Sequence, residues 1–110
     1  MAELFIAPAA RADLLAQWDY FADEVGNREL ADRYIKSAES TFKNLLHTPG
    51  LGRPRKFRSP KAKNMRSWRV DGFPKHLIFY RALPAKRGVE IVRVIHGARG
   101  SELQALLKRE

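Results

Sequence analysis

Arginine is the residue type in this chain whose number and placement most clearly suggest a binding chemistry. Thirteen of the 21 basic residues are arginines. A guanidinium group forms two parallel hydrogen bonds with a phosphate or a carboxylate, which a lysine ammonium group does not. The composition therefore favours contact with phosphate or carboxylate groups of a partner.

Several arginines interrupt stretches that otherwise have the apolar pattern of strands. A strand arginine either lies on a solvent-exposed face of the sheet or pairs with an acid such as Glu90. For Arg99, in a Gly-Ala-Arg-Gly turn, the alternatives are a contact with a phosphate and a structural role, either as a cap on the following helix or through a bond at the end of the sheet. Both kinds of role stay open for every candidate. The candidate binding residues are Arg53, Arg55, Arg66, Arg69, Arg81, Arg93 and Arg99.

Positive charge is concentrated in the second half of the sequence. The chain has 110 residues and a formal net charge of +9. Residues 1–52 contain five basic and eight acidic side chains, whereas residues 53–110 contain sixteen and four. From Arg53 to Arg69 there are eight basic residues and no acid. Such a run repels itself unless an anion compensates it, so a nucleic acid or an acidic protein is the expected partner and a solvated loop the alternative.

The sequence contains no conventional catalytic or metal-binding pattern. The chain has no cysteine, and its three histidines lack the HxxH or HExxH spacing of metal sites. No GxSxG, Walker or dinucleotide-binding glycine pattern occurs, and no serine has a visible base partner. We therefore expect neither a metal ion nor a cofactor.

Two histidines and two aromatic residues have both a structural and a functional interpretation. If residues 83–88 close a symmetric hairpin, His76 and His96 lie beside each other on adjacent strands, which fits an ordinary cross-strand pair as well as a site. Trp68 and Tyr80 could stack on bases, but their place on alternating strands favours the core. None of the four is included among the candidate site residues.

The apolar periodicity predicts a helical hairpin over residues 9–25 and 28–47. In both segments apolar residues recur at steps of three and four, which places them on one helix face. Gly26 is expected to end the first helix, and Asn27 is a good N-cap for the second.

The rest of the chain predicts strands, a basic loop and a last short helix. Residues 51–64 are rich in proline, glycine and charge and form the loop. A capping box at Ser101 and Gln104 begins the helix. The fold class is α+β, with the order β-α-α-β-β-β-α and the helical hairpin packed on one face of a mainly antiparallel sheet. The expected strands are residues 3–6, 65–70, 76–82 and 89–96.

A single domain over residues 1–110 is the default for a chain of this length. The sequence contains no run of eighteen apolar residues, and its first residues lack the basic region with which a signal peptide begins. The sequence therefore predicts neither a membrane span nor a signal peptide, and we expect a cytoplasmic protein.

The segment that begins at Met65 resembles the C-terminal half of ParE toxins of the RelE/ParE superfamily. It carries an R-x-x-x-V strand, an H-x-I-x-Y strand and an R-V-x-H-G-x-R ending. The A-x-x-D-L-x-x-x-x-x-Y run from Ala10 to Tyr20 and the P-x-x-G-R-P loop from Pro49 to Pro54 are also similar to that family. The resemblance implies the small toxin fold, which agrees with the element order above.

The same resemblance implies a function and two partners. ParE-like members are inhibitors that trap DNA gyrase on cleaved DNA, and a cognate antitoxin holds them inactive. By resemblance, the chain is the toxin of a type II toxin-antitoxin system. Its partners would be a ParD-like antitoxin with an acidic C-terminal segment, which folds on the toxin, and the gyrase–DNA complex.

RelE-like members of the superfamily instead cut messenger RNA on the ribosome. They have an arginine on the strand before the tyrosine of the H-x-I-x-Y region, and a tyrosine six residues after the arginine of the G-x-R ending. In this sequence those positions are Leu77 and Ala105, and only Arg99 matches the remaining arginine. The resemblance therefore favours a gyrase inhibitor without an enzyme activity. A ribosome-dependent endoribonuclease that uses Arg99 is the alternative, and simple nucleic-acid binding by residues 53–69 is a third.

Overall fold

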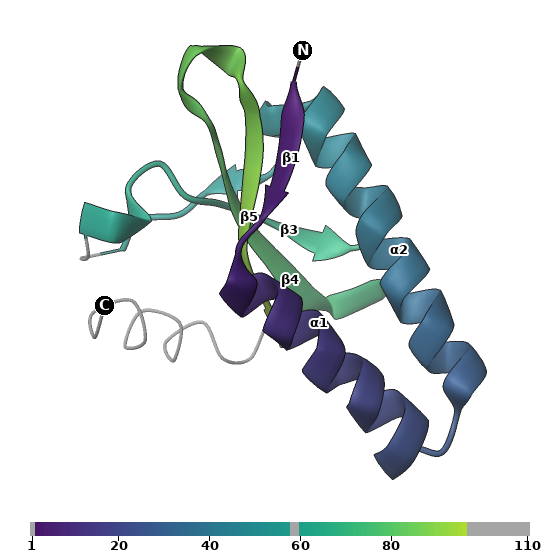
Figure 1. The fold of residues 1–110 in the computed structure, drawn as a ribbon. Helices are drawn as coiled ribbons and strands as arrows, with labels where there is room; N and C mark the ends of the chain where they lie inside the picture. The colour runs from purple at the N-terminus through teal and green to yellow at the C-terminus, as the bar shows by residue number, and fades with distance from the viewer. Residues whose placement is uncertain (1, 58–59, 97–110) are drawn as a thin grey trace.

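A helical hairpin covers one face of a five-stranded sheet in the computed structural model, which describes residues 2–57 and 60–96 (Figure 1). This arrangement confirms the expected α+β class. The predicted helix that begins at Ser101 lies outside the described residues. In chain order the elements are β1 (Glu3–Ile6), α1 (Pro8–Asp19), α2 (Arg28–His47), β2 (Arg53–Pro54), β3 (Arg66–Val70), β4 (Phe73–Ala82) and β5 (Gly88–His96).

The helical hairpin follows the sequence prediction closely. Between α1 and α2 the chain makes a π-helical turn over Tyr20–Glu24 and then reaches Gly26, whose φ of 75° ends the helix. The side chain of Asn27 accepts a hydrogen bond of 3.0 Å from the backbone N–H of Leu30, which confirms the predicted cap. The indole N–H of Trp18 donates to Asp32 at 3.0 Å and ties the two helices together.

The sheet has the strand order β1-β5-β4-β3-β2. The predicted meander of β3, β4 and β5 is confirmed, since each pairs with the next in antiparallel fashion. β1 pairs in parallel with β5, from Glu3 opposite Gly88 to Ile6 opposite Ile91, and Figure 1 shows the two strands side by side. Gly88 has a φ of 137°, and a Cβ atom there would collide with the carbonyl oxygen of Glu3. Only glycine therefore lets β1 start beside β5.

The sheet differs from the sequence prediction in two main respects, while other element ends shift by a residue. β4 begins at Phe73 instead of His76, because Asp71 and Gly72 alone make the turn and Gly72 has a φ of 79°. Residues 51–64, which we expected to be a loop, contain the short strand β2, with Arg53 opposite Ser67. Local sequence did not reveal this strand because its two residues form no alternating pattern.

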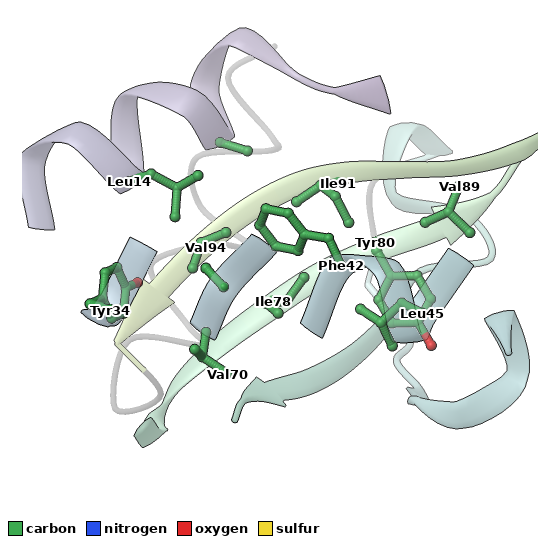
Figure 2. Close-up of a cluster of buried hydrophobic side chains, with 12 residues drawn as sticks. Leu14, Tyr34, Phe42, Leu45, Val70, Ile78, Tyr80, Val89, Ile91 and Val94 are labelled. Atoms are coloured by element: carbon green, nitrogen blue, oxygen red, sulfur yellow. The ribbon is translucent and has the colours of Figure 1, made fainter. Parts of the chain in front are cut away.

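The main core lies between the helical hairpin and the sheet, where side chains from α1, α2 and β3–β5 converge (Figure 2). Tyr80 is fully buried, as the strand pattern predicted, and Trp68 is partly buried against the same cluster. The largest buried side chains of this core are Tyr34, Tyr80, Phe42, Leu45, Ile78, Ile91, Val70 and Val89.

A smaller apolar cluster covers the opposite face of the sheet. Phe57, Ala62 and Met65, from the segment that leads into β3, pack with Phe79 and Leu77 of β4. The basic segment is therefore folded back onto the sheet by its few apolar residues, and its charged side chains lie around that contact.

Candidate functional site

Arg93 of β5 pairs with Asp13 of α1. Its Nε and Nη2 atoms donate to the two carboxylate oxygens of Asp13 at 2.8 and 2.9 Å. The backbone N–H of Val94 donates to the same carboxylate at 2.9 Å. The two side chains are only 19% and 14% exposed, so the geometry assigns Arg93 a structural role. Burial, with a further contribution from Asp13, also raises the pKa of Tyr34 above its usual value.

Arg81 is the strand arginine that pairs with Glu90. It lies opposite Glu90 in the β4–β5 register, and its Nε atom donates to the carboxylate at 2.9 Å. Both side chains are about one-third exposed or less. The cross-strand pair neutralises the charge of Arg81 at this position in the sheet.

Arg55 and Arg66 hold the segment between α2 and β3 in place. Arg66 donates to the backbone oxygen of Gly52 at 2.6 Å. Arg55 donates to the hydroxyl of Ser67 at 3.1 Å, and its guanidinium lies 5.4 Å from the ring centre of Phe79. These two arginines are half-buried and act first as anchors of the basic segment.

Arg53 and Arg69 are the exposed members of the candidate set. Arg69 lies 5.1 Å from the ring centre of Trp68, which leaves its N–H groups able to meet an anion. Within residues 2–57 and 60–96, neither side chain has a hydrogen bond or an ion pair. Lys56 and Lys63 are exposed on the same segment. Arg99 lies outside the part of the chain that the structure describes.

The hydroxyl of Tyr80 organises the loop that carries Arg53. It accepts a hydrogen bond of 2.7 Å from the backbone N–H of Gly52 and donates one of 2.8 Å to the carbonyl of Pro49. Burial raises the pKa of Tyr80, while the bond from Gly52 and the charge of Arg66 act in the opposite direction. Sequence reasoning placed Tyr80 in the core but missed its hydroxyl, because nothing in the strand pattern identifies a partner 28 residues away.

A cavity of about 720 Å³ lies between the end of α1 and the ends of β4 and β5. Its lining includes Asp13, Tyr20, Phe21, His76 and His96. The two histidines lie near each other on adjacent strands, as expected, with ring centres 5.5 Å apart. They are directly opposite because the β4–β5 register shifts by one residue between Phe79 and Tyr80. Burial, and secondarily the neighbouring His96, lowers the pKa of His76.

Two further properties of the described residues bear on the site. Among residues 2–57 and 60–96, no group of three or more histidine, aspartate or glutamate side chains is placed to hold a metal ion. Over the same ranges, no helix has the length and apolar character needed to cross a membrane.

Comparison with known proteins identifies the family. Residues 4–100 match the family described as the ParE toxin of the type II toxin-antitoxin system parDE. The chain belongs to the ParE toxin family. As a member of a toxin-antitoxin family, it has an antitoxin as the implied partner. Comparison with curated proteins gives no match.

Two solved structures share the fold of this ParE-family chain. A chain of the chromosomal ParDE system from P. aeruginosa has a TM-score of 0.68 at 21% identity, over 87% of this chain and 96% of that one. The isolated RelE toxin of E. coli has a TM-score of 0.50 at 16% identity, over 99% and 98%. At these identities the similarity establishes the fold alone.

One of the two positions compared with RelE-like toxins lies within the described residues of this ParE-family structure. Leu77, where the resemblance to RelE requires an arginine, packs in the apolar cluster with Phe79 and Met65. Ala105, the second distinguishing position, lies outside the described residues.

Proposed function

We propose that this chain is a cytoplasmic toxin that inhibits DNA gyrase and that a cognate antitoxin neutralises. The observation that carries the proposal is the apolar environment of Leu77 within a ParE-family fold. A ribonuclease of the RelE type needs cations that stabilise the charge developing at the scissile phosphate. Leu77 supplies an apolar contact instead.

The exposed cations indicate how the toxin would meet its target. Arg53 and Arg69 retain free hydrogen-bond donors, whereas the other four described candidates contact groups of the toxin itself. We propose that Arg53, Arg69 and the neighbouring Lys56 and Lys63 face acidic groups of the gyrase–DNA complex or of the antitoxin.

The helical hairpin supplies the apolar part of the proposed antitoxin contact. Leu15, Tyr20 and Val25 are 61%, 52% and 49% exposed, although all three are large apolar residues. A partner segment that buries them would gain hydrophobic stabilisation, and acidic residues beside it would compensate the arginines. A ParD-like antitoxin with an acidic C-terminal segment has this composition.

The decisive experiment measures two activities of one purified preparation. The toxin alone, and the toxin with the antitoxin encoded by the neighbouring reading frame, are added to gyrase with relaxed plasmid and to translating ribosomes with a defined messenger RNA. We expect loss of supercoiling or accumulation of cleaved DNA, reversal by the antitoxin, and intact messenger RNA. Intact gyrase activity together with ribosome-dependent RNA cleavage would overturn the proposal.

Matched variants connect the activity to residues. Arg69→Ala should lower gyrase inhibition, whereas Arg33→Ala, an exposed arginine on α2, should leave it unchanged. Arg99→Ala tests the alternative. If the wild-type toxin cleaves messenger RNA and Arg99→Ala abolishes that cleavage without lowering the melting temperature, the endoribonuclease activity replaces gyrase inhibition as the function.

A further inference from the structure

His76 and His96 form a cross-strand pair that no part of the proposed function uses. They lie opposite each other on β4 and β5, with ring planes at 75° and ring centres 5.5 Å apart. Both line the cavity between α1 and the ends of these strands, so a small ligand can approach them. The only other histidine of the chain is His47, in the last turn of α2, and there is no cysteine.

The separation of the two rings suits a shared metal ion. A zinc–nitrogen bond is about 2.0–2.1 Å long, which puts the ion roughly 3.2 Å from the centre of a coordinating imidazole ring. Ring centres 5.5 Å apart are within that reach, and because the two rings meet edge to face at 75°, the exposed His96 ring must turn a nitrogen toward the ion. No large movement of either strand is needed to bring the rings to this spacing.

The surroundings hold His76 in place and keep it in the form that binds metals. The rings of Tyr34, Phe73 and Phe21 lie 5.1, 6.1 and 6.1 Å from the His76 ring and restrict its rotation. Burial lowers the pKa of His76, so the neutral imidazole, which has a free lone pair, dominates at neutral pH.

Among the described residues that line the cavity, the two histidines are the best candidate metal ligands. The carboxylate of Asp13 is occupied by Arg93 and by the N–H of Val94. The cavity wall also includes Tyr20, the first residue of the π-helical turn, a type of distortion found frequently at functional sites. An ion held by two imidazoles would keep its remaining positions for water or for a group of a partner.

We propose that His76 and His96 bind one divalent transition-metal ion, of the class of Zn²⁺ or Ni²⁺, and thereby link β4 to β5. Imidazole suits these ions, whereas Mg²⁺ and Ca²⁺ prefer oxygen ligands. Since the ion would bind the folded pair and not separated strands, it would also stabilise the fold. This site is independent of gyrase inhibition.

The test uses the full-length chain without a histidine tag. Isothermal titration with ZnCl₂ and NiCl₂ near neutral pH should show one site per chain, and MgCl₂ should give no binding. His76→Gln and His96→Gln should each weaken metal binding about tenfold or more, since the loss of even an outer-shell partner of a metal ligand typically costs about 10–100-fold in affinity. His47→Gln is the matched control and should bind as the wild type does.

A second measurement separates a metal site from a defect in folding. The melting temperature of the wild type should rise on addition of Zn²⁺, whereas that of His96→Gln should not change. His96 is exposed, so this variant is expected to fold even if His76→Gln does not. The proposal would be overturned if His96→Gln bound Zn²⁺ as tightly as the wild type, or if His47→Gln lost as much Zn²⁺ affinity as His96→Gln. Either outcome counts whether or not the toxin inhibits gyrase.

Discussion

Asp13 and Arg93, eighty positions apart in the chain, complete the edge of the sheet where β1 stops. β1 pairs with β5 only as far as Ile91, and the N–H of Ala7 bonds to the Ile91 carbonyl at 2.9 Å. Beyond that point the carboxylate of Asp13 accepts a hydrogen bond from the backbone N–H of Val94. If β1 were longer, one of its carbonyl groups could accept this bond. The Asp13 side chain of α1 thus takes the place of β1 at this edge of the sheet.

Replacing Asp13 should therefore destabilise the protein. Asp13→Ala leaves Arg93 and the Val94 N–H without their acceptor, and we expect a loss of about 2–4 kcal/mol in the free energy of unfolding. Asp13→Asn, which keeps an acceptor, should cost less. Urea unfolding measures both, and Asp23→Ala, at an exposed position, is the control. Equal stability of the Asp13 and Asp23 variants would contradict the structural role.

The Tyr80 hydroxyl should stabilise the protein by supporting the loop that precedes β2. Tyr80→Phe removes the acceptor of the Gly52 N–H and the donor to the Pro49 carbonyl. We expect a loss of about 1–3 kcal/mol, because a buried N–H is left without a partner. Tyr20→Phe, at a half-exposed tyrosine, should change stability little in the same unfolding assay. If the two substitutions have the same small effect, the hydroxyl contributes nothing to the loop.

Local sequence patterns predicted most of the elements. Apolar spacing located the helical hairpin, and Asn27 marked the start of α2, because helix periodicity and caps depend on neighbouring residues. Such features need only the chain within a few residues of each helix end. The sequence also placed His76 and His96 near each other on adjacent strands, but their direct pairing depends on a register shift that skips Val92 and that the strand pattern did not reveal.

Features that depend on distant residues did not emerge from the sequence. The position of β1 depends on Gly88, and the short strand β2 depends on the opposite residues of β3. For the candidate site, the sequence named Glu90 as an acid that a strand arginine could pair with but did not say which arginine, and it did not identify Asp13 as the partner of Arg93, because Asp13 belongs to a different element. Arginines that anchor the fold and arginines free for a partner have the same local pattern.

The lowered pKa of His76 predicts a stability that depends on pH. The unfolded chain binds this proton near the ordinary histidine pKa of about 6.5, and the folded chain binds it only at lower pH. The contribution of neutral His76 to the free energy of unfolding is therefore complete above the pKa of the unfolded state and is lost as the pH falls through the pKa of the folded state.

Urea unfolding in a metal-free buffer at about pH 7.5 and about pH 5 tests this dependence of stability on pH. The decrease in the free energy of unfolding between the two pH values should be smaller in His76→Gln than in the wild type. His47→Gln should retain the wild-type difference. An identical pH dependence in all three proteins would exclude a contribution from His76.

Arg69 should contribute charge-dependent affinity for the antitoxin. Arg69→Glu introduces repulsion at an exposed position, and we expect about tenfold weaker binding at about 0.1 M salt. The difference from the wild type should shrink at about 0.5 M salt, since exposed charges are screened. Titration calorimetry measures both, with Arg33→Glu on α2 as the control.

Arg81→Glu should also weaken the complex, and it should destabilise the toxin itself by repelling Glu90. Affinities that both substitutions leave unchanged at either salt concentration would refute the contact.

The parallel pairing of β1 with β5 affects the order in which the protein folds. Glu3 and Gly88 are 85 positions apart, whereas β3, β4 and β5 are joined by short turns. Closing the longer loop costs more chain entropy and depends on β5 already being in place. During synthesis, β1 therefore has no strand to join until residues 88–91 have left the ribosome. The sheet reaches its full width only after its last strand has been translated.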